Sequence, residues 1–153
     1  MIRLAKISDI NSIIELLKDV LLIHHNIRPD LFKEKGYKYD KDGLIKLMSK
    51  DNYKIFVYEE NNKVLGHIFI EIKENLESFS INYNKEIYID DLCVDEKYRG
   101  KNIGKELVLY VKEYAKEINA NYITLHVYKG NLASDFYEKL GFIERYKSLE
   151  IKL

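Results

Sequence analysis

The sequence predicts a single α/β domain whose first half is an antiparallel sheet and whose second half adds a strand–helix–strand unit. Two observations predict it. Tyr53–Glu60 and Val64–Lys73 are β-rich runs joined by Asn61-Asn62-Lys63, which is the signal of a hairpin with antiparallel pairing. Farther along, the isoleucine-rich run Glu86–Val94 and the run Tyr122–Tyr128 lie on either side of an amphipathic helix.

The elements before the hairpin are a short strand and two helical regions. Residues 2–7 form the predicted opening strand, and Ser8-Asp9 is a predicted N-cap. Pro29 interrupts the chain after the first helix, and Asp30–Met48 is predicted to hold a second, less regular helical region. Apolar residues at three- and four-residue spacing mark the first helix as amphipathic, and they are Ile10, Ile13, Ile14, Leu17, Val20 and Leu21.

The elements after the hairpin end with a helix and a strand. A short helix over Leu132–Leu140 is predicted to stop at Gly141 as its C-cap, and Phe142–Leu153 is predicted as the final strand. Glu74–Tyr83 is polar and carries no assignment. The helix that follows Arg99-Gly100 has one apolar face, made of Ile103, Leu107, Val111, Ala115 and Ile118.

The composition is that of one compact globular domain spanning residues 1–153, with 46% hydrophobic and 33% charged residues. The formal net charge of +0 provides no field that would attract nucleic acid, and no stretch is apolar enough to span a bilayer. The N-terminus lacks the layout of a secretion signal, and the single cysteine, Cys93, excludes an internal disulfide, so we expect a cytoplasmic protein. No spacing of ligand residues suggests a metal site.

The most informative stretch is the turn between the strand Glu86–Val94 and the helix that follows it. The first turn of a helix has free backbone N–H groups and the positive end of the peptide dipoles, so it binds phosphate well. Gly100 and Gly104 would let a phosphate approach without a Cβ, while Arg99 and Lys101 add positive charge. Taken alone, the turn leaves open that its glycines serve only the backbone.

Arg99-Gly100-Lys101-Asn102-Ile103-Gly104 resembles the signature of the GNAT family of acetyltransferases, Gln/Arg-x-x-Gly-x-Gly/Ala directly after a strand. The arginine and the final glycine match, whereas Asn102 stands at the middle glycine. Asparagine tolerates left-handed backbone angles well, so we expect the loop geometry to survive. A second block, Leu125–Phe142, is similar to the family's strand, asparagine, short helix and Phe-Tyr-x-x-x-Gly-Phe ending. Together with the opening residues, the resemblance covers nearly the whole chain.

The resemblance implies the GNAT acyl-CoA N-acyltransferase fold, in which a mixed, mostly antiparallel sheet splays between strands 4 and 5 and is flanked by helices. It also implies acetyl-CoA as the co-substrate, with the pantetheine arm paired to the open strand and the pyrophosphate on the helix N-terminus. The resemblance also implies that Asn131 offers its amide to the cofactor arm. A helix N-cap is the structural alternative for Asn131, and the two roles can coexist. The cofactor-binding residues that the resemblance implies are Leu92, Cys93, Val94, Arg99, Gly100, Lys101, Asn102, Ile103, Gly104, Lys105 and Asn131.

The implied reaction is attack of a neutral amine on an acetyl thioester. An alkylamine has a pKa of about 10.4, so a base or a water relay must remove a proton, and a backbone N–H near Val94 would stabilise the oxyanion. The resemblance makes Tyr137 the proton donor to the departing thiolate, with a packed aromatic ring as the alternative. Ile87–Leu92 is similar to polyamine acetyltransferases, which makes Asp90 the base, or else a structural carboxylate. Whether Asp91 is the base instead stays open, because successive strand residues point to opposite faces unless a bulge intervenes.

The expected acceptor is a primary amine of a small molecule, polyamine-like in view of that similarity. A protein lysine or N-terminus is the alternative within the same fold, and a CoA-binding regulatory module without turnover is the alternative from another class. Many relatives pair through their C-terminal strands, so a homodimer is a further expectation. His24-His25 lie near the Arg28-Pro29-Asp30 turn, a region that often shapes the acceptor pocket in this family, and we expect them to be solvated surface residues. We expect His67 and His126 to be ordinary core or rim residues, and Cys93 to behave as a small hydrophobe.

Overall fold

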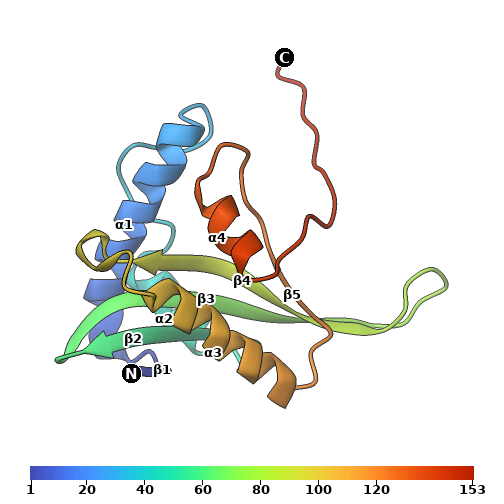
Figure 1. Cartoon of the computed structure of the whole chain (residues 1–153), viewed down its shortest axis with the longest axis horizontal. Coiled ribbons are helices and arrows are strands. Elements are labelled where there is room, and N and C mark those ends of the chain that lie inside the picture. The colour runs from blue at the N-terminus through green and yellow to red at the C-terminus, as the bar shows by residue number, and fades with distance from the viewer.

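The computed structural model describes all residues, 1–153, and shows a five-stranded sheet with helices on both faces (Figure 1). Short 3-10 turns at Ile7–Asp9 and Glu96–Tyr98 precede two of the helices. The helices are α1 (Ile10–Ile27), α2 (Lys41–Met48), α3 (Ile103–Glu117) and α4 (Ala133–Lys139). The strands are β1 (Ile2–Leu4), β2 (Tyr53–Glu60), β3 (Lys63–Asn75), β4 (Asn84–Val94) and β5 (Tyr122–Leu125).

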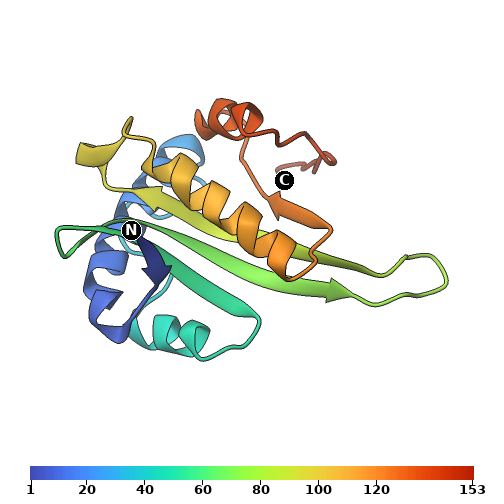
Figure 2. The same ribbon diagram turned by 60° about the horizontal axis from the view of Figure 1, so that its bottom comes forward.

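The strands lie in the sheet in the order in which they occur in the chain, β1-β2-β3-β4-β5. The first four pair antiparallel, and β5 pairs parallel to β4 after the crossover through α3. The sheet separates two apolar cores. Helices α1 and α2 cover one face, and α3 and α4 cover the other (Figure 2). The α/β class and the mixed sheet predicted from the sequence are therefore confirmed.

The β2–β3 hairpin is closed by the predicted asparagine turn. Asn61 and Asn62 adopt φ values of 51° and 60°, the left-handed conformation that a two-residue turn of this kind requires at both positions. Asparagine meets this requirement at little cost because its short polar side chain tolerates the left-handed region. The sequence signal and the observed register, with Glu60 paired to Lys63, agree.

Strands β4 and β5 part midway along β4. They pair only from Glu86 to Ile89 on β4, opposite Tyr122 to Leu125 on β5, where β5 ends. β4 continues for five more residues, Asp90–Val94, of which the last four pair with β3 alone. The sheet therefore opens between its fourth and fifth strands, as the resemblance implied.

A β-bulge lies on β4 at the start of the parted segment. Phe69 of β3 pairs with Asp91 and Ile70 pairs with Ile89, so Asp90 is an extra residue without a partner opposite. An extra residue cancels the usual alternation of side chains. Asp90 and Asp91 consequently both turn to the face that α1 and α2 cover, where their hydrogen-bond partners lie.

Three predicted elements differ from the structure. The predicted final strand, Phe142–Leu153, is wrong: residues 143–153 are extended but make no backbone hydrogen bond (Figure 1). Their alternating pattern is strand-like, yet a strand needs a paired edge, and side-chain ion pairs of Arg145 and Glu150 hold the segment instead. Within Asp30–Met48 only α2 is helical. Asp9 stands at the start of α1, but its carboxylate binds Arg3 and the Lys6 N–H rather than the helix.

Gly66 allows β3 to approach the parted segment closely. A Cβ at this position would lie 2.8 Å from the carbonyl oxygen of Cys93 and 3.4 Å from Leu107 Cδ1. We expect Gly66→Ala to lower the melting temperature by about 3 to 10 °C, because overpacking costs about 1 to 3 kcal/mol and the atom that must move is backbone. Calorimetry measures this effect, and an unchanged melting temperature would contradict the close approach.

Candidate active site

A cleft of about 180 Å³ lies where β4 and β5 part. The parted backbone from Asp90 to Val94 lines one side, and the end of β5 and the chain after it, from Leu125 to Val127, line the other. Asn131, Tyr137 and His24 from α1 also line the cleft. The structure thus brings the two sequence blocks that carry the resemblance to opposite walls of one cavity.

The turn before α3 presents a row of free backbone donors. The six consecutive N–H groups from Gly100 to Lys105 have no backbone or side-chain acceptor in the chain, and the first intrahelical bond at this end runs from the Glu106 N–H to the Asn102 oxygen. Free donors at a helix N-terminus are a site for phosphate groups. Gly100 adopts a φ of 79°, and a Cβ there would meet nothing within 4 Å, so the approach to these donors is open.

Asn102 adopts the left-handed conformation, with φ 65° and ψ 4°. The expectation that asparagine preserves the loop geometry in place of glycine is therefore confirmed. Its side chain makes no capping hydrogen bond.

We expect Asn102→Gly to keep or slightly improve the affinity for CoA, because glycine adopts the same backbone angles without strain. Asn102→Val should weaken it, since a β-branched residue is an outlier at positive φ. Titration calorimetry with CoA measures both. A large loss in Asn102→Gly would mean that the asparagine side chain is itself a ligand.

Arg99 links the turn to the cleft. Its Nε donates to the carbonyl oxygen of Val94 at 3.1 Å, and the residue also lines the cavity. Asp95 donates its backbone N–H to Leu65 on β3, so the alternation along the strand directs the Val94 N–H to the opposite edge, into the gap. This N–H therefore has no acceptor in the chain and can donate to a ligand in the gap.

Asn131 and Tyr137 project from the α4 side. Asn131 Oδ1 accepts the Ala133 N–H at 2.9 Å, which caps the start of α4, while its Nδ2 makes no hydrogen bond in the chain and remains free to bind a ligand. The Tyr137 ring packs between Phe136 and Phe142, and its hydroxyl has no partner in the chain. Burial raises the pKa of Tyr137, and the nearby charge of Asp91 raises it further, so the hydroxyl stays protonated at neutral pH.

Asp90 is saturated with donors. Its carboxylate accepts hydrogen bonds from Tyr39 and Tyr53 at 2.6 Å each and from the Lys38 ammonium at 2.7 Å. Burial alone would raise the pKa of Asp90, but the bonds from Lys38 and the two tyrosines outweigh it and hold the pKa below its ordinary value. Asp90 is therefore a stable anion that connects the α1–α2 loop to β2 and β4.

Asp91 has one partner, His67 of β3. His67 Nε2 lies 2.5 Å from Asp91 Oδ2, and the histidine is fully buried against the ring of Phe69. From the sequence, His67 is expected to be an ordinary core or rim residue. Its position two residues before Phe69 on a buried strand could have indicated that the two share one face of the sheet, but not that His67 meets an acid there.

The other candidate groups are less reactive. Burial raises the pKa of the Cys93 thiol to about 12, and Cys93 Sγ lies 3.4 Å from the Leu16 carbonyl oxygen, which agrees with its expected role as a small hydrophobe. The expectation that His24 is a solvated surface residue is wrong, because its ring packs half-buried against Phe32 and Tyr128 and lines the cleft. Burial lowers the pKa of His24. No group of three or more His, Cys, Asp or Glu is arranged to hold a metal ion.

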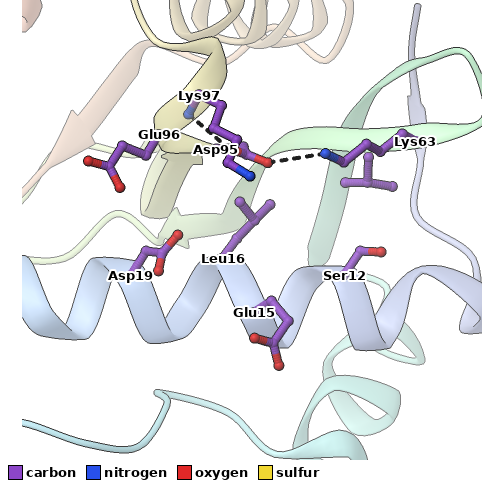
Figure 3. A pocket seen from close by; sticks show the side chains of 9 residues that line it. Ser12, Glu15, Leu16, Asp19, Lys63, Asp95, Glu96 and Lys97 are labelled. Atoms are coloured by element: carbon purple, nitrogen blue, oxygen red, sulfur yellow. Dashed lines mark hydrogen bonds and ion pairs between the residues drawn. The ribbon is translucent and has the colours of Figure 1, made fainter.

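A larger surface cavity, of about 340 Å³, lies between α1 and the β2–β3 turn (Figure 3). Its walls are mostly charged: Glu15 and Asp19 come from α1, and Lys63 and Asp95, 3.5 Å apart, lie together on the side opposite α1. None of the residues that the sequence predicts for the site lines this cavity. The parted-strand cleft, with its free donors and buried acids, is therefore the candidate active site.

The fold is that of the GNAT acetyltransferases. The sequence model of the acetyltransferase (GNAT) family matches residues 17–142, and the chain belongs to this family. No helix of the protein combines the length and apolarity that crossing a membrane would require.

Similar proteins span archaea, plants and bacteria. An uncharacterised N-acetyltransferase of Methanocaldococcus jannaschii is 33% identical over 65% of this chain, and glucosamine 6-phosphate N-acetyltransferase of Arabidopsis thaliana is 32% identical over 60%. The matched parts make up 43% and 59% of those relatives. A Bacillus halodurans protein, solved as a mutant, is 26% identical and superposes with a TM-score of 0.95, covering 100% of this chain and 99% of its own.

Proposed function

We propose that this protein transfers an acetyl group from acetyl-CoA to a primary amine of a small molecule by direct attack. The observation that carries the proposal is the row of six unpartnered N–H groups from Gly100 to Lys105, which begins beside the gap between β4 and β5. The family uses this pairing of a phosphate-binding turn with an opened strand for acetyl-CoA. The residues present here fit the same ligand.

Each part of the site has a task in this proposal. The N–H groups of the turn bind the pyrophosphate, Leu92–Val94 pair with the pantetheine arm, and the free Nδ2 of Asn131 donates to the arm. The Val94 N–H stabilises the oxyanion that forms when the amine nitrogen bonds to the acetyl carbon. When the carbon–sulfur bond breaks, the Tyr137 hydroxyl donates a hydrogen bond to the departing thiolate.

The charge and shape of the cleft support a small cationic acceptor. Two carboxylates, Asp90 and Asp91, lie on its acceptor side, and the α1–α2 loop closes over Asp90 through Lys38 and Tyr39. A protein substrate would need a more open groove on this side. The Arabidopsis relative acts on glucosamine 6-phosphate, which is also a small amine. Two functions remain as alternatives: acetylation of a protein lysine or N-terminus, and CoA binding by a regulatory module without turnover.

Thiol release from acetyl-CoA tests the proposal. The panel consists of a diamine, a polyamine, glucosamine 6-phosphate and a lysine-containing peptide, each with CoA binding measured by calorimetry. Steady thiol release with a small amine and not with the peptide supports the proposal. Release with the peptide alone would favour a protein acceptor, tight CoA binding without release on any acceptor would favour the module, and no CoA binding at millimolar concentration would reject all three.

We also propose a cytoplasmic homodimer. The cytoplasm suits the single unpaired cysteine. The extended segment 143–153 leaves Ile143, Leu149 and Ile151 exposed, and the outer edge of β5 has no neighbouring strand. Such a segment can add to the open sheet edge of a second copy.

We expect light scattering to give twice the mass of the chain, and a variant that ends at Phe142 to give the mass of a monomer. A monomeric full-length protein at micromolar concentration would contradict the pairing.

A further inference from the structure

A buried histidine–aspartate pair forms part of the wall of the cleft, and the function proposed above leaves it without a task. His67 is completely buried, and Asp91 is 6% exposed and lines the cavity. Placing a carboxylate and an imidazole inside an apolar core is unfavourable unless they are paired. Here they pair only with each other, at 2.5 Å.

The bulge at Asp90 is what brings Asp91 to the acceptor side. Without the extra residue, two successive strand residues would point to opposite faces, and one acid would lie under α3. With it, Asp90 contacts Tyr53 and Asp91 contacts His67, both of which belong to the face under α1 and α2. Asp90 and Asp91 therefore lie on the same face of the sheet, and both are candidates for the base.

Asp90 has no spare capacity to accept a proton. Both of its oxygens are bound: Oδ1 accepts from Lys38, and Oδ2 accepts from Tyr39 and Tyr53. A proton added to this carboxylate would displace one of these donors, and a carboxylate that accepts several hydrogen bonds favours its charged form. Asp90 therefore holds the α1–α2 loop in place instead of taking a proton.

Asp91 retains a free oxygen. Oδ2 is bound to His67, whereas Oδ1 makes no hydrogen bond in the chain. The only fully buried side-chain nitrogen or oxygen without a partner is His67 Nδ1, so Asp91 Oδ1 is not sealed off from the cleft. Because an ionised carboxylate only accepts, His67 is assigned the tautomer with its proton on Nε2, donated to Asp91.

We propose that Asp91, oriented by His67, is the base that takes the proton from the acceptor amine, and that Asp90 is not. This inference rests on the acetyl transfer proposed above. The first proton passes from the ammonium nitrogen to Asp91 Oδ1, the pair changes from one negative charge to neutral, and the freed nitrogen lone pair bonds to the acetyl carbon. When the carbon–sulfur bond breaks, the nitrogen loses its second proton, which protonates the departing thiolate, and Asp91 returns the first proton to solvent. His67 is a positioning residue, since it acts through Asp91.

The titratable groups around Asp91 come from four elements and three loops. Those on elements are Asp90 and Cys93 of β4, His67 of β3, His24 of α1 and Tyr137 of α4. Those on loops are Arg99 and His126, which line the cleft, and Lys38, which binds Asp90. Tyr137 and Cys93 keep their protons at neutral pH because burial raises the pKa of each. His24→Asn and His126→Asn variants remove the two histidines that line the cleft, so pH–rate profiles measured in these variants separate them from the Asp91–His67 pair.

The test compares Asp91→Asn with its matched neighbour Asp90→Asn. We expect Asp91→Asn to lower kcat by about 100-fold or more at pH 7, with the rate recovering as rising pH supplies free amine, and with an unchanged KM for acetyl-CoA. Asp90→Asn should raise the KM of the acceptor and lower kcat less than 10-fold. His67→Phe should shift the acid limb of kcat/KM, and His67→Gln, which keeps a donor, should restore it partly.

Melting curves and CoA calorimetry for each variant exclude misfolding as the cause. A larger loss of kcat in Asp90→Asn than in Asp91→Asn, or a pH–rate profile unchanged by His67→Phe, would overturn the inference. Turnover by the wild-type protein would still support the proposed function in that case. Wild-type protein that binds acetyl-CoA but releases no thiol with any amine would overturn both.

Discussion

Tyr137→Phe should lower kcat by about 10- to 100-fold while the affinity for acetyl-CoA stays within about twofold of the parent. The hydroxyl has no partner in the chain, and Tyr137 lines the cleft in which the cofactor would bind. A hydrogen bond to a charged group contributes about 1.5 to 3 kcal/mol, and here the charge exists only once the thiolate departs. Phenylalanine keeps the ring packing against Phe136 and Phe142, so the fold should not change.

The pKa of Tyr137 adds a second readout. Burial, and then the charge of Asp91, raise this pKa above its ordinary value, so the hydroxyl keeps its proton throughout the neutral range. The wild-type rate should therefore show no alkaline loss from this tyrosine below about pH 10. Equal kcat in Tyr137→Phe and the parent, measured with saturating acetyl-CoA, would remove Tyr137 from the reaction.

Gly104→Val should weaken CoA binding by at least about 10-fold. A Cβ at Gly104 would already lie 3.4 Å from Phe136 Cζ and 3.6 Å from Val94 Cγ2, in ordinary contact. The two further methyl groups of valine have no space there, so they must displace α4 or the start of α3. Both movements misplace the N–H groups of the turn, each of which would contribute about 1.5 to 3 kcal/mol through a bond to a charged phosphate.

Gly104→Ala is the matched control, because its single Cβ meets only ordinary contact distances. It should bind CoA nearly as the parent does. Calorimetric titration of both variants, with melting curves to confirm folding, decides the matter. If Gly104→Val bound CoA as tightly as Gly104→Ala, the turn would not be the phosphate site.

The parts of the site that lie in one short stretch of sequence were predictable. The turn from Arg99 to Lys105 carries its own geometry, because glycine and asparagine permit positive φ and a helix N-terminus always leaves donors free. Asn102 shows this directly: its residue type indicated a left-handed backbone, and its φ is 65°. The hairpin at Asn61-Asn62 was predictable for the same local reason.

The parts that depend on residues far apart in the sequence were not predictable. The bulge at Asp90 comes from the register between β3 and β4, and the partners of Asp90, which are Lys38, Tyr39 and Tyr53, lie 37 to 52 residues away. His67 resembles any other buried strand residue until β4 brings Asp91, 24 residues later, within hydrogen-bond distance of it. The predicted final strand was wrong because alternating apolar residues indicate a strand-like segment but not its pairing partner.

By itself, the sequence determined the α/β class, the hairpin, the amphipathic helices and the turn from Arg99 to Lys105. Each of these is set by local backbone preference and by the spacing of apolar residues. Only the tertiary structure decided which side of the sheet each acid faces, that Asp90 is bound by three donors and that Asp91 pairs with a buried histidine. The physical reason is that hydrogen bonding and burial of side chains depend on strand register, and a shift by one residue exchanges the two faces of a strand.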